Sequence, residues 1–374
     1  MLWFAIKTLF HERGRLIITL IGIIFSTVLT LIQISMFLGM MGNATAIIRH
    51  TDADIWIASK NTRAFDFANP FPEHRINIVR SFPDILWTDR IILTWGFLKL
   101  ADGGREQVQI VGFNPQSGVG GPWSMIRGSP SDVKGGRYMI IDNSEERRTG
   151  KLEVGSRWEL SERSFKLVGI SQGGRSFTTA PVIFMSYNQA QAHPGIVQEK
   201  QTTFIVANVK DEKKISDIVK SLREIMIDND VFTKNDFIYQ TVMYWTVQTG
   251  IGMAFFLTAL LGLIIGGAIV GQTIYANTME HLKEFGTLKA LGARNKDIYT
   301  VIFSQVVISA VVGFSAGSVL ILLAKGGIEK AGLTLYLSPL LFLILFIMVL
   351  LTCLLSAYFS VRKIRTLDPM MVFR

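Results

Sequence analysis

Four long apolar runs in a one-plus-three pattern constrain this chain more than any other feature of its sequence. Each run is long enough, at about 1.5 Å per residue, to cross a hydrocarbon core of about 30 Å as a helix. The sequence therefore predicts an α-helical membrane protein with a large domain, residues 42–249, inserted between its first and second membrane helices. The predicted membrane helices are residues 16–41, 250–276, 298–324 and 337–360.

The first run has a competing interpretation as a secretory signal. Basic residues precede it, and Ala44-Thr45-Ala46 resembles a signal cleavage site. The apolar part of a signal peptide holds only about 7 to 15 residues, which is shorter than this run. We therefore expect an uncleaved membrane helix.

The placement of basic residues predicts the orientation, because Lys and Arg collect in short cytoplasmic loops. Residues 1–15, 277–297 and 361–374 carry 11 basic and 5 acidic residues, which is +6 of the chain's net charge of +9. The inserted domain is nearly balanced, with 25 basic and 23 acidic residues. We therefore expect both termini in the cytoplasm and the inserted domain outside it, together with the short loop 325–336. The basic excess reflects topology and does not indicate nucleic-acid binding.

The two terminal segments fit this orientation. Residues 1–15 mix large apolar side chains with basic ones, which is typical of a helix lying at the cytoplasmic membrane interface. Residues 361–374 are expected to form a cytoplasmic tail.

Several classes of site are excluded or disfavoured. The chain has no G-x-x-x-x-G-K-[ST] phosphate loop, so we expect no ATP hydrolysis by the chain itself and no bound cofactor. Its single cysteine, Cys353, excludes an intrachain disulfide, and its five histidines lie far apart, so no metal site is expected. The middles of the apolar runs contain no Asp, Glu, Lys or Arg, which disfavours a proton- or ion-coupled transporter.

Small residues recur at a spacing of four within the membrane runs, at Gly262–Gly266, Gly267–Gly271 and Gly313–Gly317. Such spacings allow the close approach of two helices, either by packing or by dimerisation. The last of them also fits the G-x-S-x-G motif of hydrolases, but that motif needs a strand-to-helix turn. Because this copy lies inside a membrane run, no catalytic role is expected.

The segment between the second and third runs has the pattern of a short amphipathic helix. Apolar residues recur in it at steps of three, at Leu282, Phe285, Leu288 and Leu291, and alternate with charged residues. Gly292 supplies a helix stop, and Asn295 can cap the next helix. The pattern alone leaves open whether this helix lies passively on the membrane surface or docks a partner.

Residues 280–293 read Glu-His-Leu-Lys-Glu-Phe-Gly-Thr-Leu-Lys-Ala-Leu-Gly-Ala. They resemble the E-R-x-x-E-I-G-x-L-R-A-I-G-A signature of permease subunits in the FtsX and MacB group of ABC transporters. The C-terminal Leu367-Asp-Pro-Met-Met-Val-Phe-Arg374 resembles the closing P-x-x-A-L-R of that family, although Met371-Val372-Phe373 departs from it. The family shares the one-plus-three layout with an external domain, so the resemblance extends over the whole chain.

In that family the signature segment docks on the cytoplasmic ATPase subunit. The resemblance therefore implies a coupling helix at residues 277–297, with docking residues Glu280, Lys283, Glu284, Phe285, Gly286, Leu288, Lys289, Ala290, Leu291, Gly292 and Ala293. Unlike MacB, this sequence has no fused ATPase domain. A separate ATPase chain that binds the ATP is implied, as in DevC-like permeases.

The function implied by the resemblance is that of a non-catalytic permease subunit of an ABC exporter in the bacterial inner membrane. Two copies would form a homodimer, and ATP hydrolysis would move the external domain to drive efflux or release of a substrate, which is mechanotransmission. A periplasmic adaptor and an outer-membrane duct are candidate partners. Two alternatives stay open: a family member that regulates a cell-wall hydrolase or senses a peptide without transport, and a membrane receptor or scaffold with no ATPase partner.

The inserted domain alternates short strand-like runs with glycine-containing turns. Strands are predicted at Ile55–Ala58, Trp95–Leu100, Gln107–Phe113, Tyr138–Ile141, Phe165–Ile170, Val182–Met185 and Thr203–Val209. Helices are predicted at residues 73–81 and 213–226. These elements predict an α+β domain with a membrane-proximal lobe, residues 42–99 and 199–245, and a β-rich lobe, residues 100–198.

One loop of this domain is unusually aromatic, with Phe65, Phe67 and Phe71 between residues 65 and 72. These residues are candidates for contact with an external partner. The alternative is core packing, because buried aromatic residues are commoner than exposed functional ones.

Overall fold

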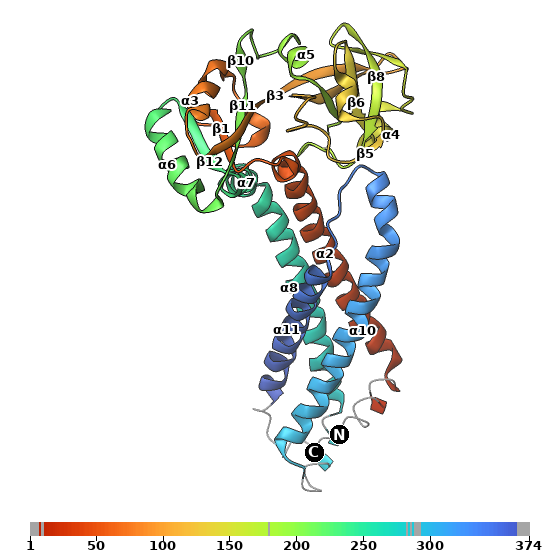
Figure 1. Ribbon diagram of the computed structural model, residues 1–374. Coiled ribbons are helices and arrows are strands. Elements are labelled where there is room, and N and C mark those ends of the chain that lie inside the picture. Colours follow the sequence, from red (N-terminus) through yellow and green to blue (C-terminus); the bar gives the residue numbers. More distant parts are fainter. Residues whose placement is uncertain are drawn as a thin grey trace. The chain divides into compact units, whose positions relative to one another are not determined.

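The computed structural model of the chain describes residues 7–8, 11–178, 180–281, 283–284, 286–287 and 293–364 (Figure 1). The chain divides into two compact units. The helix unit comprises Met1–Leu38 and Gly252–Arg374, and the sheet unit comprises Gly39–Ile251.

Four helices are long and apolar enough to cross a membrane. They are α2 (Arg13–His50), α8 (Ile251–Glu280), α10 (Asn295–Lys330) and α11 (Pro339–Ile364). The one-plus-three prediction is therefore confirmed. Each helix extends past its predicted range at one end or at both, because hydropathy marks only the apolar part of a helix. In α2, for example, polar side chains such as Thr45 bond within the helix, from Oγ1 to the carbonyl of Met41 at 2.8 Å, and the helix continues to His50.

The small-residue pairs lie at helix contacts within the chain. Gly262–Gly266 of α8 and Gly313–Gly317 of α10 both face α2, where an added Cβ would meet side chains such as Thr27. Gly267–Gly271 of α8 faces α11, and the hydroxyl of Ser360 on α11 donates a hydrogen bond to the carbonyl of Gly271 at 2.8 Å. The predicted close approach of helices is confirmed, and it joins helices of one chain.

The sheet unit is built on twelve described strands. They are β1 (Ile55–Ser59), β2 (Phe71–Pro72), β3 (Ile85–Lys99), β4 (Arg105–Phe113), β5 (Met125–Arg127), β6 (Tyr138–Asp142), β7 (Arg157–Leu160), β8 (Arg163–Ser171), β9 (Val182–Ser186), β10 (Gln201–Thr202), β11 (Phe204–Val209) and β12 (Asn229–Thr233). Ten of them form one sheet in the order β12-β1-β11-β3-β4-β9-β6-β8-β5, with β7 against β3 and β8. Strands β4 and β9, and β6 and β8, run parallel, while the other pairs are antiparallel. All seven predicted strands are present.

Strand β3 joins two parts of this sheet. Its residues 85–91 pair with β11, and residues 92–99 pair with β4. Only its last third was predicted, as Trp95–Leu100, because the first half lacks a clean alternation of apolar and polar residues. Strand β3 ends at Lys99, where the boundary between the membrane-proximal and β-rich lobes was predicted, but its pairing changes from β11 to β4 within the strand. The division into two lobes stays a prediction.

The helices of the sheet unit are α3 (Ile76–Arg80), α4 (Glu146–Thr149), α5 (Tyr187–Gln191), α6 (Ile215–Ile225) and α7 (Lys234–Met243). A π-helical segment, η6 (Tyr244–Gln248), follows α7, and short 3-10 segments include η1 (Phe65–Phe67) and η2 (Glu73–Arg75). The predicted helices at 73–81 and 213–226 correspond to η2 with α3 and to α6 (Figure 1).

Alternate residues of β1 serve two cores, because successive side chains of a strand point to opposite faces. Ile55 and Ile57 pack with residues of α3 and α6. Trp56 and Ala58 pack with Phe237 of α7 and with residues at the end of α2. The predicted α+β fold of the inserted domain is confirmed.

Strand β12 and helix α7 were not predicted from the sequence. The strand begins with Asn229 and Asp230, residue types that strands disfavour, and it exists because it pairs with β1 over five positions. Helix α7 is short, and its start is capped by Thr233, whose hydroxyl accepts a hydrogen bond from the Asp236 N–H at 3.1 Å.

Candidate functional site

The candidate site is a cluster of charged side chains in the helix unit, here called the charged joint. It comprises Glu12, Arg15, Glu280, His281 and Glu284. Glu12 and Arg15 flank the start of α2, whereas Glu280 is the last residue of α8. The joint therefore connects the start of the first membrane helix with the start of the signature segment.

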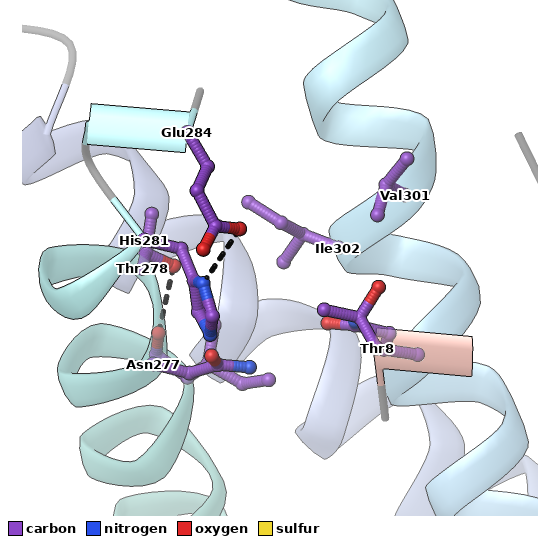
Figure 2. Close-up of a pocket in the computed structure, with 9 residues that line it drawn as sticks. Thr8, Asn277, Thr278, His281, Glu284, Val301 and Ile302 are labelled. Carbon is purple, nitrogen blue, oxygen red and sulfur yellow. Dashed lines mark hydrogen bonds and ion pairs between the residues drawn. The ribbon is translucent and has the colours of Figure 1, made fainter. Parts of the chain in front are cut away.

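Two sets of ion pairs make this connection. The carboxylate of Glu12 pairs with His281 Nε2 and, at 3.0 Å, with Arg15 Nη1. Arg15 also pairs with the carboxylate of Glu280 through Nη2. On its other side the imidazole of His281 contacts the Glu284 carboxylate, with Nδ1 and Oε2 2.9 Å apart (Figure 2). The His281 ring thus lies between one carboxylate near α2 and another in the signature segment.

The pKa of His281 is set by opposing effects. Burial of the imidazole lowers the pKa, but hydrogen bonds to Glu12 and Glu284 and the charges of these carboxylates raise it, and the net pKa lies above its ordinary value. The two carboxylates therefore favour the doubly protonated ring, in which both nitrogens are donors.

A small hollow lies beside the joint. Its lining includes Thr8 and Glu284, residues of α8, and Val301 and Ile302 of α10 (Figure 2). The cavity volume is about 10 Å³, which is at the lower limit for a single water molecule. A cavity of this size has no room for a small-molecule substrate.

The structure describes part of the predicted docking segment. Lys283 and Glu284 are helical and exposed, Gly286 is helical, and Ala293 is half-buried just before α10. The remaining predicted docking residues, Phe285, Leu288, Lys289, Ala290, Leu291 and Gly292, lie outside the described residues. The docking role itself stays a prediction.

The start of α10 differs slightly from the prediction. The helix begins at Asn295, so the capping position is Arg294 and not Asn295. The Arg294 N–H donates to the Asp297 carboxylate at 2.9 Å, which satisfies a backbone donor at the helix start.

Glu12, Arg15 and His281 were not predicted as site residues. Residues 1–15 were predicted to form an interfacial helix, of which the structure describes Lys7, Thr8 and residues 11–15. The separation between Glu12 and His281 is 269 residues, and no local pattern links them. The available signal was an acidic residue, Glu12, within an otherwise basic segment.

The proposed aromatic contact patch requires a correction. Phe65 and Phe71 are 2% and 5% exposed and belong to the cores of the sheet unit, so they are not surface contact residues in this structure. The alternative of core packing holds for both, because their rings fill space between the sheet and its covering helices. Phe67 is 49% exposed, and its ring also contacts Tyr244 and Trp245 at centroid distances of 5.4 and 5.6 Å.

Two family descriptions match the chain. Residues 16–225 match the MacB-like periplasmic core domain, and residues 232–369 match the FtsX-like permease C-terminal domain. A curated relative is the macrolide export ATP-binding/permease protein MacB of Photorhabdus laumondii subsp. laumondii, which is 22% identical over 225 residues. That alignment covers 58% of this chain and 33% of the relative, so the chain matches about a third of the relative's length.

Solved structures also resemble parts of the chain. The periplasmic region of MacB from Actinobacillus actinomycetemcomitans is 16% identical, with a TM-score of 0.38, over 52% of this chain and 95% of that one. The extracellular domain of the noncanonic ABC-type transporter YknZ from Gram-positive bacteria is 11% identical, with a TM-score of 0.36, over 48% of this chain and 98% of that one.

Proposed function

This chain belongs to the family of FtsX-like permeases with a MacB-like periplasmic core domain, and from this premise we propose that it is the membrane subunit of an ABC exporter that transmits force. A separate ATPase chain binds and hydrolyses the ATP and docks on residues 280–293. The movement reaches the sheet unit, which lies outside the inner membrane, and drives efflux or release of a substrate.

The observation that carries this proposal is the charged joint. Glu280, His281 and Glu284 belong to the signature segment, and the first two pair directly with Arg15 and Glu12. A displacement of the segment therefore acts on α8, to which it is bonded covalently, and on α2, to which it is bound by ion pairs.

Helix α2 is suited to carry such a displacement. It is a continuous helix of 38 residues from Arg13 to His50, or about 57 Å at 1.5 Å per residue. Its C-terminal part belongs to the sheet unit, where Ile47 and Ile48 pack into the core with Trp56. One unbroken helix thus contributes residues both to the charged joint and to the core of the sheet unit.

The composition of the membrane helices supports an exporter whose substrate does not pass through the bilayer along these helices. The middles of the four predicted membrane runs contain no charged residue, so no polar path for a substrate or coupling ion follows from the sequence. In the proposed complex both termini are cytoplasmic, and two copies of the chain pair as a homodimer with two ATPase chains. A periplasmic adaptor and an outer-membrane duct are the partners expected on the other side.

The test is recovery of a nucleotide-binding partner with the full-length chain in detergent. The chain is purified from its native host, and the eluate is photolabelled with 8-azido-ATP. We expect a labelled second chain with the wild type and its loss with Leu288→Glu plus Leu291→Glu, which places charges on the apolar face predicted for the signature segment. A matched control, Leu86→Glu plus Ile227→Glu, adds the same charges at positions that are 60% and 73% exposed in the sheet unit, and it should keep the partner.

The two outcomes have different consequences. Loss of the labelled chain only in the signature variant supports docking at residues 280–293. Absence of a labelled chain with the wild type, or equal recovery with both variants, overturns the proposed docking and favours a receptor or scaffold without an ATPase.

A further inference from the structure

Asp66 is a buried carboxylate in the sheet unit that the proposed force transmission does not use. It lies in η1, and the residue as a whole is 8% exposed. Gln109 of β4 donates a hydrogen bond from Nε2 to Asp66 Oδ1 at 2.9 Å. The backbone N–H of the preceding residue, Phe65, is held by the hydroxyl of Thr241 on α7 at 3.3 Å. Asp66 is thereby fixed where η1, β4 and α7 meet.

A second buried polar group lies beside this carboxylate. The indole Nε1 of Trp245 and the Asp66 Oδ2 are both buried, and neither has a partner with normal hydrogen-bond geometry. The two residues are neighbours, because the ring of Phe67, which follows Asp66, contacts the ring of Trp245, and the indole lowers the pKa of the Asp66 carboxyl as a donor. One buried group that can only donate thus adjoins one oxygen that, when ionised, can only accept.

The ring of Trp245 is held by aromatic neighbours. Phe177, in the segment between β8 and β9, stacks on it with ring centroids 3.6 Å apart and ring planes 13° apart. The ring of Phe67, the residue after Asp66, also contacts the ring of Trp245, with centroids 5.6 Å apart. Trp245 lies in the π-helical segment η6, and α8 begins six residues further along the chain. A π-helical turn is a rare conformation that often marks a functional site.

The pKa of Asp66 lies above the ordinary value for an aspartate. Burial of the carboxyl group raises the pKa of Asp66 to about 6, and hydrogen bonds from Gln109, Trp245 and the backbone only partly oppose this rise. All of these opposing groups are uncharged. The ionisable side chains on the surrounding elements include Arg63, Glu106, Arg175, Asp236 and Tyr244.

We propose that Asp66 is a proton switch for Trp245: the ionised carboxylate accepts a hydrogen bond from the indole N–H, and protonation of the carboxyl group from solvent releases the indole. Because Oδ1 accepts from Gln109, protonation occurs on Oδ2, and the resulting O–H is a much weaker acceptor for the indole N–H than the ionised oxygen. A buried unsatisfied polar group is destabilising, so each protonation state favours a different position of the indole.

The switch acts on the segment that leads into a membrane helix. Release of Trp245 loosens η6, the turn that precedes α8, while the stack with Phe177 tends to retain the ring. The proton switch is a property of the sheet unit alone. Only its role as a sensor of external pH rests on the proposed function, because that role requires the sheet unit to lie outside the membrane.

The test is fluorine NMR of the full-length chain in detergent, labelled with 5-fluorotryptophan. The chain has seven tryptophans, so the Trp245 signal is assigned by its loss in Trp245→Phe. We expect this signal to shift between about pH 4 and pH 8 with a midpoint at about 6, and to stay at its low-pH position in Asp66→Asn. Asp89→Asn is the matched control: Asp89 is 9% exposed and accepts hydrogen bonds from Asn114 and Ser117, and its replacement should leave the transition in place.

A second variant covers the case in which Asp66→Asn does not fold. Gln109→Met removes the amide that stabilises the ionised carboxylate, so the midpoint of the Trp245 signal should move to higher pH. A Trp245 signal that does not titrate, or that titrates identically in Asp66→Asn or in Gln109→Met, overturns the proposal. Because this measurement involves no ATPase, its result is independent of the docking experiment.

Discussion

The imidazole of His281, one residue beyond the end of α8, is paired with the carboxylate of Glu12, one residue before the start of α2. Both side chains are largely buried, at 18% and 21% exposure. The described start of the signature segment, Glu280 and His281, is thereby bound to residues at the start of α2, a membrane helix that is distant in sequence.

The energy of this pair is measurable by a double-mutant cycle. We expect Glu12→Gln and His281→Gln each to lower the thermal midpoint of the purified chain, with a coupling energy of about 1 kcal/mol, because charged hydrogen bonds that are partly shielded from water exceed exposed pairs in strength. Lys325→Gln with Glu329→Gln is the control. That pair is 3.8 Å apart with about two fifths of each side chain exposed, and its coupling should be near zero. Equal coupling in both cycles would contradict a special role for the joint.

The same pair gives a pH dependence of stability. Because Glu12 and Glu284 raise the pKa of His281 above its unfolded value, its stabilisation is fully present below that unfolded value and is lost as pH rises through the folded pKa. Thermal unfolding of the wild type between about pH 6 and pH 9 should therefore show a fall that His281→Gln lacks. The prediction is wrong if the variant and the wild type have parallel pH profiles.

Asp66 predicts a separate dependence at lower pH. The folded pKa of Asp66 is raised from 3.8 to about 6. The stabilisation that this group contributes is therefore fully present below pH 3.8 and is lost as pH rises through about 6. The difference between the folded and unfolded pKa values corresponds to about 3 kcal/mol in the free energy of unfolding, at about 1.4 kcal/mol per pKa unit. In Asp66→Asn this contribution should be absent, as the difference between the two unfolding profiles from about pH 4 to pH 7 will show. A constant difference across this range would refute the assignment.

The glycine contacts predict which small residues tolerate a larger side chain. Gly266→Val should lower stability by about 1 to 3 kcal/mol, because its Cβ would collide with Ser26 of α2 and the interior is closely packed. Gly326→Val places the same side chain on α10 where nothing lies within 4 Å, and it should be tolerated. Thermal unfolding in detergent distinguishes the two, and similar losses would mean that α2 and α8 are not packed through Gly266.

The aromatic loop predicts a contrast between two neighbouring residues. Phe65→Ala should cost about 3 to 5 kcal/mol, because the ring is 2% exposed and stacks on Phe204 with centroids 5.1 Å apart. Phe67→Ala should cost much less, because the residue is 49% exposed. Chemical unfolding monitored by near-ultraviolet circular dichroism measures both. If an external partner uses this loop, its binding should depend on Phe67 in a folded variant.

Hydropathy sufficed to identify the membrane helices and most strands of the sheet unit. A backbone in hydrocarbon must satisfy its hydrogen bonds internally, so an apolar run of membrane length is expected to form a helix. Strands such as β4 and β8 alternate or are continuously apolar over enough residues to be recognised. Strand β12 was not recognisable, because its pairing with β1 comes from another part of the chain.

The candidate site likewise has a part that could be predicted from the sequence and a part that only the tertiary structure decided. Glu280 and Glu284 were predicted from the sequence, because they belong to a signature that lies within one local segment. His281 lies in the same segment, but it was not predicted as a site residue. Their connection to Glu12 and Arg15, and the meeting of Asp66 with Trp245, were decided only by tertiary structure. Ion pairs and buried polar contacts depend on which distant segments the packed core brings within a few ångströms, and local periodicity carries no information about that distance.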